Sequence, residues 1–134
     1  MANEAVILQT NNLEYRQGTV ADGSAWAKGT VMIFTITPNT LNSHTSHKQF
    51  PAGILAVEKV ASDGQTTVPI LVSGDVTAIA DGTVAIGDIV CVADVANRFR
   101  TLGAVSIEKL TNIAGVAVSG AGDGIAFTLR LKLG

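Results

Sequence analysis

Residues 79–93 read IADGTVAIGDIVCVA, and residues 20–34 read VADGSAWAKGTVMIF. In each stretch an Asp-Gly dipeptide is followed, six or seven residues after the aspartate, by a second glycine and then by an apolar run. Asp-Gly supplies the positive φ that tight hairpin turns require, and a short apolar run after such a turn is typical of a buried strand. The two stretches therefore predict that one β-unit occurs twice in the chain.

Further matched pairs follow in the same order and at nearly the same separation, as an internal repeat requires. The pairs are Asp22-Gly23 with Asp81-Gly82 (59 residues apart), Gly29 with Gly87 (58), Ala52-Gly53-Ile54 with Ala114-Gly115-Val116 (62) and Asp63-Gly64 with Asp123-Gly124 (60). We interpret this as a duplication, with repeat halves of about 17–75 and 76–134.

The residue pattern predicts short strands. Glycine, valine, isoleucine and threonine are frequent, and turn dipeptides recur throughout the chain. In 125–132, Ile125, Phe127, Leu129 and Leu131 alternate with smaller or charged residues, as in a half-buried strand. Pro69 cannot donate to a strand ladder and suggests an edge position or a bulge. Strands are expected at 30–36, 52–60, 66–73, 75–80, 88–93, 97–102, 113–118 and 125–132, and one short helix at 106–113.

The predicted fold is all-β: a small antiparallel β-barrel or sandwich, built from two repeats of about 60 residues that wrap around one core. With 134 residues the chain fits a single domain over 17–134. Residues 1–16 mix an apolar patch with a polar link and are interpreted as an extended N-terminal arm that reaches another subunit. The polar segment 37–49 is expected to be an exposed loop.

Composition excludes several functions. The net charge is -2 and no cluster of lysine and arginine occurs, so nucleic-acid binding is not expected. The longest apolar runs are far shorter than the roughly 20 residues that span a bilayer. The N-terminus lacks the basic start of a signal peptide, which predicts an unprocessed protein made in the cytoplasm. Charged residues make up only 15% of the chain, a proportion suited to a surface covered by partners.

No catalytic, cofactor-binding or metal site is predicted. His44 and His47 lack neighbouring ligands and are interpreted as solvated loop residues. Each of the four aspartates before glycine is explained by turn formation alone. Cys91 lies in an apolar run and is expected to pack as a small core residue. Trp26, the single tryptophan, is assigned to an interface rather than to ligand stacking.

The motifs ANEAV near the N-terminus, TVADGSAWAKGTV at 19–31 and FPAGILAVEKVASDG at 50–64 carry a more specific signal. The chain, over nearly its whole length, resembles the head-decoration (cement) proteins of tailed bacteriophages, a family long described only as a phage domain of unknown function and encoded beside the major capsid protein. The resemblance implies a β-rich, non-enzymatic structural protein on the outer surface of the virion capsid, made in the host cytoplasm.

By the same resemblance, the protein would bind the major capsid protein, associate with itself, with a trimer favoured, and stabilise contacts between capsomers. An N-terminal arm in such proteins joins the capsid lattice, a role that would fall here to residues 2–15, with Val6, Ile7, Leu8, Leu13 and Tyr15 as contacts. The alternative is a β-barrel module that binds a small ligand or a glycan in a cavity lined by Trp26 or phenylalanines.

Overall fold

The computed structural model describes residues 3–8, 13–38, 40–46, 49–102 and 113–133. Within these ranges all regular structure is β-strand and no helix occurs, which confirms the all-β class. The helix expected at 106–113 lies outside the described residues except for Ile113, the first residue of a strand. The strands are β1 (Val6–Ile7), β2 (Glu14–Thr19), β3 (Val31–Phe34), β4 (Leu41–Ser43), β5 (Pro51–Leu55), β6 (Thr67–Ala80), β7 (Ile89–Val92), β8 (Arg98–Thr101), β9 (Ile113–Ala117) and β10 (Ala126–Lys132).

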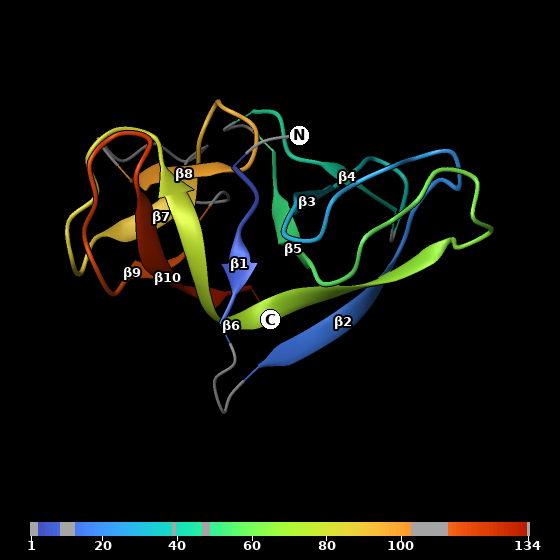
Figure 1. The fold of residues 1–134 in the computed structure, drawn as a ribbon, viewed down its shortest axis with the longest axis horizontal. Helices are drawn as coiled ribbons and strands as arrows, with labels where there is room; N and C mark the ends of the chain where they lie inside the picture. Colours follow the sequence, from blue (N-terminus) through green and yellow to red (C-terminus); the bar gives the residue numbers. More distant parts are fainter. Residues whose placement is uncertain (1–2, 9–12, 39, 47–48, 103–112, 134) are drawn as a thin grey trace.

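The long strand β6 runs through both halves of the molecule and changes direction near its middle (Figure 1). Two strands were expected here, at 66–73 and 75–80, and the structure joins them into one. Gly74 lies at the junction with a φ of 143°, and a Cβ there would come 2.5 Å from the Leu13 side chain, so the bend requires glycine. The expected division between residues 75 and 76 falls inside this strand.

Each half of β6 belongs to its own ring of strands, and the two rings form the two lobes in Figure 1. The second ring runs β10-β9-β7-β8-β6 and closes because β10 also pairs with β6. The first ring runs β2-β6-β5-β3-β4 and closes through an isolated bridge between Thr19 and Thr40. Closed rings leave few strand edges unpaired. We call these rings the first and second barrels.

The pairing pattern of the first barrel recurs in the second. In both, the strand after the Asp-Gly turn has a register shift after its second pair, between Met32 and Ile33 in β3 and between Val90 and Cys91 in β7. Both barrels contain one parallel contact among otherwise antiparallel pairs. The matched contacts are the parallel pairs Thr19–Thr40 and Ile79–Arg98, and the antiparallel bridges Trp26–Lys59 and Val84–Ala121.

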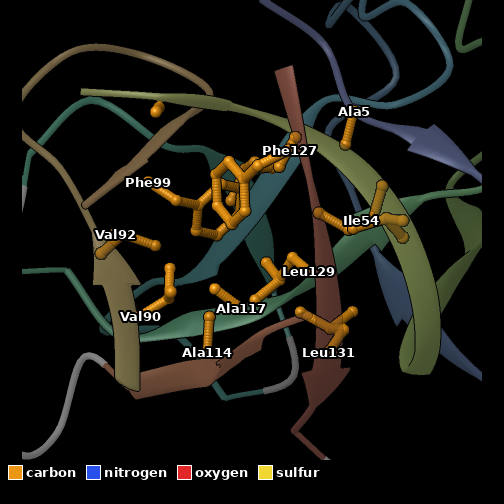
Figure 2. Packing of buried hydrophobic residues seen from close by; sticks show 14 of the residues in the cluster. Ala5, Ile54, Val90, Val92, Phe99, Ala114, Ala117, Phe127, Leu129 and Leu131 are labelled. Atoms are coloured by element: carbon orange, nitrogen blue, oxygen red, sulfur yellow. The ribbon is translucent and has the colours of Figure 1, made fainter. Parts of the chain in front are cut away.

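The buried apolar side chains form two clusters, whereas one shared core was expected. Because each half closes its own ring, its inward residues meet across that ring and not across the whole molecule. In the second barrel the Phe99 and Phe127 side chains lie together at the centre (Figure 2). Three residues of the first barrel, Val31, Ile54 and Leu71, point outward and join the second cluster, so the two barrels are packed against each other.

Three local expectations are corrected. Pro69 lies in an interior strand and not at an edge; its carbonyl oxygen accepts from the Ala56 N–H at 3.1 Å, so its missing N–H also faces the β5 side and the pairing with β2 is unaffected. Ile125 is 60% exposed and precedes β10, while the other apolar residues of that alternation are buried. The predicted loop 37–49 contains the strand β4.

Candidate functional site

The N-terminal residues lie at the joint between the barrels (Figure 1). The Ala5 N–H donates to the Gly29 carbonyl of the first barrel at 2.8 Å, and the Leu8 N–H donates to the Asp75 carbonyl at 2.9 Å. Between them, β1 pairs antiparallel with β6 of the second barrel. The described residues 3–8 therefore bind both barrels of their own chain.

This placement divides the residues that the sequence assigned to an interface. Ile7 and Trp26 are buried by their own chain. Leu8 and Leu13 are half-buried, and Val6 and Tyr15 are 58% and 45% exposed. Contact of this segment with a capsid or another subunit stays a prediction, and Val6 and Tyr15 are the two large side chains left to make it.

A second exposed apolar surface was missed by the sequence reasoning. Phe34 and Phe50 are 46% and 52% exposed, and their rings meet edge to face with centroids 5.8 Å apart. Ile36 beside them is fully exposed, and Tyr15 lines the same groove as Phe34. We call Tyr15, Phe34, Ile36 and Phe50 the aromatic face. Exposed apolar side chains gathered in this way mark interaction surfaces.

Comparison of the two repeats could have revealed this face. The register of the matched strands aligns Phe34 with Val92, which is fully buried, and Ile36 with Asp94. At these two positions the exposed apolar side chains are present in one copy of the fold and not in the other. The fold itself does not require it.

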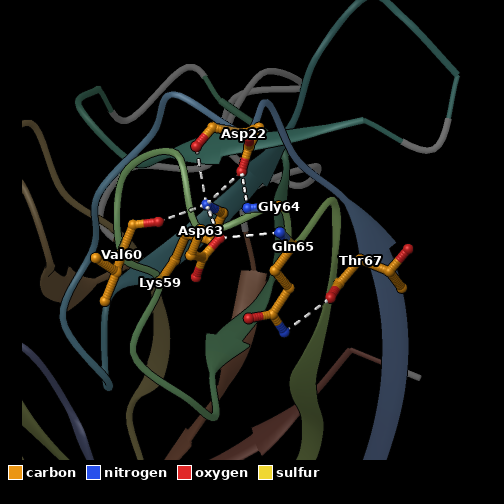
Figure 3. A network of polar contacts seen from close by, with 7 residues as sticks. All are labelled: Asp22, Lys59, Val60, Asp63, Gly64, Gln65 and Thr67. Atoms are coloured by element: carbon orange, nitrogen blue, oxygen red, sulfur yellow. Dashed lines mark hydrogen bonds and ion pairs between the residues drawn. The ribbon is translucent and has the colours of Figure 1, made fainter.

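A buried lysine links the loop between β2 and β3 to the loop between β5 and β6 (Figure 3). The Lys59 ammonium donates to the carbonyl oxygens of Val60 and Asp22, at 2.7 and 2.9 Å, and pairs with the Asp63 carboxylate at 2.7 Å. Burial alone would lower the pKa of Lys59, but the hydrogen bonds to Asp63 and Asp22 outweigh it and raise the pKa. Asp22 and Asp63, predicted as turn residues, thus also bind the ammonium group of Lys59.

His44 is not a solvated loop residue as expected, because it is fully buried between the barrels. Its Nδ1 accepts from the Asn97 N–H at 3.1 Å, so Nε2 carries the proton and donates to the Ala93 carbonyl at 2.7 Å. The Asn97 side chain accepts from the Val31 N–H at 2.9 Å. Burial lowers the pKa of His44. His47 lies outside the described residues.

Lowering the pH from about 7 to about 5 is expected to destabilise the protein through His44. Burial holds the pKa of His44 in the folded chain below its ordinary value of 6.5, so between these two values the unfolded chain binds a proton that the folded chain does not. The contribution of neutral His44 to stability is fully present above the pKa of the unfolded chain. It is lost as the pH falls below that pKa, by at most about 1.4 kcal/mol per pH unit. Urea unfolding at several pH values should show this slope in the wild type and in His47→Gln, and a smaller slope in His44→Gln.

No site for chemistry emerges from the described part of the chain. It contains no group of three or more His, Cys, Asp or Glu residues placed to hold a metal ion. Cys91 is buried, which confirms its packing role. Phe99 and Phe127 pack inside the second barrel, and the Trp26 side chain, 9% exposed, lines a surface groove beside Lys59 and Val60. Among the described residues there is also no helix of the length and hydropathy needed to cross a membrane.

Comparison with solved structures shows a similar fold. The crystal structure of the N base of the head fiber protein gp8.5 of bacteriophage phi29 matches with a TM-score of 0.57. The match covers 90% of this chain and 95% of that one, at 15% sequence identity. No family model and no curated protein matches the sequence. At this identity the match establishes a shared fold over nearly the whole length of both chains.

Proposed function

We propose that this chain is a non-enzymatic structural protein of a bacteriophage head, which binds the outer surface of the capsid and stabilises contacts between capsomers. The observation that carries the proposal is the fold shared, over nearly the whole chain, with a protein named as part of a phage head. The motif resemblance to decoration proteins supports the same role from the sequence alone.

The geometry suits a cement. The two barrels are joined by a shared strand, by β1 and by the buried contacts around His44, so the molecule can resist a pull between them. The aromatic face offers an apolar contact for the major capsid protein or for a neighbouring copy. Many identical weak contacts on a symmetric lattice add up to strong binding. Capsomers could separate only after these contacts break, which stabilises the head by mass action.

The proposal is tested with particles assembled from the major capsid protein encoded by the same phage. We expect the purified wild-type chain to co-sediment with expanded particles and to raise the temperature at which they rupture. The double variant Phe34→Asp and Phe50→Asp should bind at least about tenfold more weakly, because a buried charge is costly at an apolar contact. Ile86→Asp is the matched control, since Ile86 is 73% exposed and lies on the second barrel.

Absence of wild-type binding to the particles would overturn the proposal. Equal binding by the double variant and the control would remove the aromatic face from the contact. Deleting residues 2–15 is not a suitable test of the arm, because Ala5 and Ile7 belong to the buried cluster of the second barrel and their loss would disturb the fold. Val6→Asp changes an exposed residue of the same segment and tests it without that loss.

A further inference from the structure

In the described part of the chain, the outer edge of β2 (Glu14–Thr19) is unpaired except at Thr19. β2 pairs with β6 on one side, and Gln17 lies opposite Pro69. Because the Pro69 carbonyl accepts from the Ala56 N–H on the other side of β6, Gln17 and Pro69 form a non-hydrogen-bonded pair. The main-chain groups of Gln17 therefore point away from β6, and by the period of two those of Tyr15 do the same. Apart from the bridge at Thr19, no described strand pairs with β2 on that outer side.

The second barrel shows what this edge can take. The matched parallel contacts align Thr19 with Ile79, and therefore Gln17 with Thr77. At Thr77 the edge is not open, because β1 is added there as an antiparallel strand with Val6 opposite Thr77. The same edge of the same unit is thus paired with β1 in one copy and, among the residues that the structure describes, left without a strand in the other.

The side chains beside the two edges differ accordingly. Next to Thr77, Val76 is fully buried in the cluster that includes Ile7. Next to Gln17, Arg16 is exposed, and a groove of about 550 Å³ opens between β2 and the interior of the first barrel. The groove is lined by Tyr15, Phe34, Leu41 and other apolar residues, with Arg16 as the one charged residue among those that line it.

We infer that the β2 edge at Tyr15–Gln17, with this groove, accepts an extended apolar segment of a different protein as an added antiparallel strand. A second copy of this chain is a poor donor of the added strand. Each chain has two such edges, at β2 and at Thr77 of β6, but a single β1. If one copy gave its β1 to the β2 edge of another, its own β6 edge would lose its partner. The Arg16 guanidinium at the groove lies 3.5 Å from the Glu14 carboxylate of its own strand and has further N–H donors for a carboxylate beside the apolar residues of the incoming segment.

Added strands of this kind bind through main-chain hydrogen bonds, with side-chain pockets giving specificity. The inference deepens the proposed function by giving the partner segment its chemistry, and it rests on that function only for the origin of the segment. Binding of such a segment to the isolated protein can be measured without any capsid.

The probe is a synthetic labelled peptide with the sequence of residues 3–8, Asn-Glu-Ala-Val-Ile-Leu, titrated into the full chain. We expect saturable binding with shifts of the Tyr15 and Gln17 amide signals in NMR spectra. Gln17→Pro removes the outward N–H without removing a bond to β6 and should weaken binding at least about tenfold. Gln17→Ala keeps the N–H and is the matched control. Melting curves establish that both variants fold.

Equal affinity of the Gln17→Pro and Gln17→Ala variants would overturn the inference, as would absence of binding to the wild type. Shifts confined to Val76 and Thr77 would show exchange with the chain's own β1 and also overturn it. If the wild type formed a concentration-dependent dimer that Gln17→Pro did not form, the added strand would come from a second copy of this chain. That result would overturn the inference of a different protein. If the Gln17→Pro variant bound capsids as well as the wild type does, this inference would be overturned and the proposed function would stand. If the wild type bound the peptide but not the capsid, the inference would stand and the proposed function would be overturned.

Discussion

Replacing Gly115 with alanine is expected to destabilise the protein by about 3 kcal/mol, at the upper end of the cost of overpacking. A Cβ at this position in β9 would collide with the carbonyl oxygen of Arg130 on the neighbouring strand β10. Main-chain atoms in a paired strand cannot move aside as a flexible side chain can. Chemical unfolding of the purified variant measures the loss.

The repeat supplies a second test of the same cause. Gly53 is the matched glycine of the first barrel, and a Cβ there would lie 2.6 Å from the Leu71 carbonyl oxygen. Gly53→Ala should therefore destabilise in the same direction. Gly122→Ala is the control, because nothing lies within 4 Å of its Cβ position. Equal stability of Gly115→Ala and Gly122→Ala would contradict the explanation of the Ala-Gly-[Ile/Val] motif as a point of close strand approach.

Phe99→Ala is expected to cost about 3 to 5 kcal/mol, the usual range for removing a buried phenylalanine. Phe99 is 1% exposed and packs at the centre of the second barrel beside Phe127 (Figure 2). Because the barrels share β6 and the contacts of Val31, Ile54 and Leu71, the whole chain should unfold in one transition. The first barrel is then destabilised by a change in the second.

Trp26 makes this measurable, since the single tryptophan is buried in the first barrel. Its fluorescence and the circular dichroism of the whole chain should give the same midpoint in the wild type, and both midpoints should fall together in Phe99→Ala. Leu41→Ala, at the matched position of the first barrel, is the companion variant. A Trp26 transition that stays unchanged in Phe99→Ala would show that the barrels unfold independently.

Much of the strand architecture could be predicted because it rests on local chemistry. Three of the four Asp-Gly turns place their glycine at positive φ, namely Gly64, Gly82 and Gly124, whereas Gly23 does not adopt it. The alternation in 125–132 correctly marks Phe127, Leu129 and Leu131 as inward. Turn residues and a period of two act within a few neighbours along the chain, so they can be read without knowing which strands meet.

The candidate site could not be predicted in the same way. The segment around Val6 was interpreted as an arm because it has apolar residues beside a polar link. That pattern fits the surface of a partner subunit and a cleft in the same chain equally well, so the sequence could not decide between them. His44 reads as a loop residue because its partners Ala93 and Asn97 are about 50 residues away. Phe34 reads as core from its apolar run, yet its side chain is 46% exposed and its ring meets that of Phe50, a contact with a residue outside the run that the run itself does not reveal.

The sequence alone determined that this protein is all-β and built from two similar units, because turn chemistry, strand periodicity and repeat spacing are properties of the chain itself. The tertiary structure decided that the units close into two barrels with separate cores, that β6 serves both, and that β1 covers the edge of only one. The physical reason is that each of these features depends on which main-chain N–H and C=O groups, far apart in the sequence, pair with one another. Several strand arrangements satisfy these groups equally well, and the burial of side chains selects one arrangement.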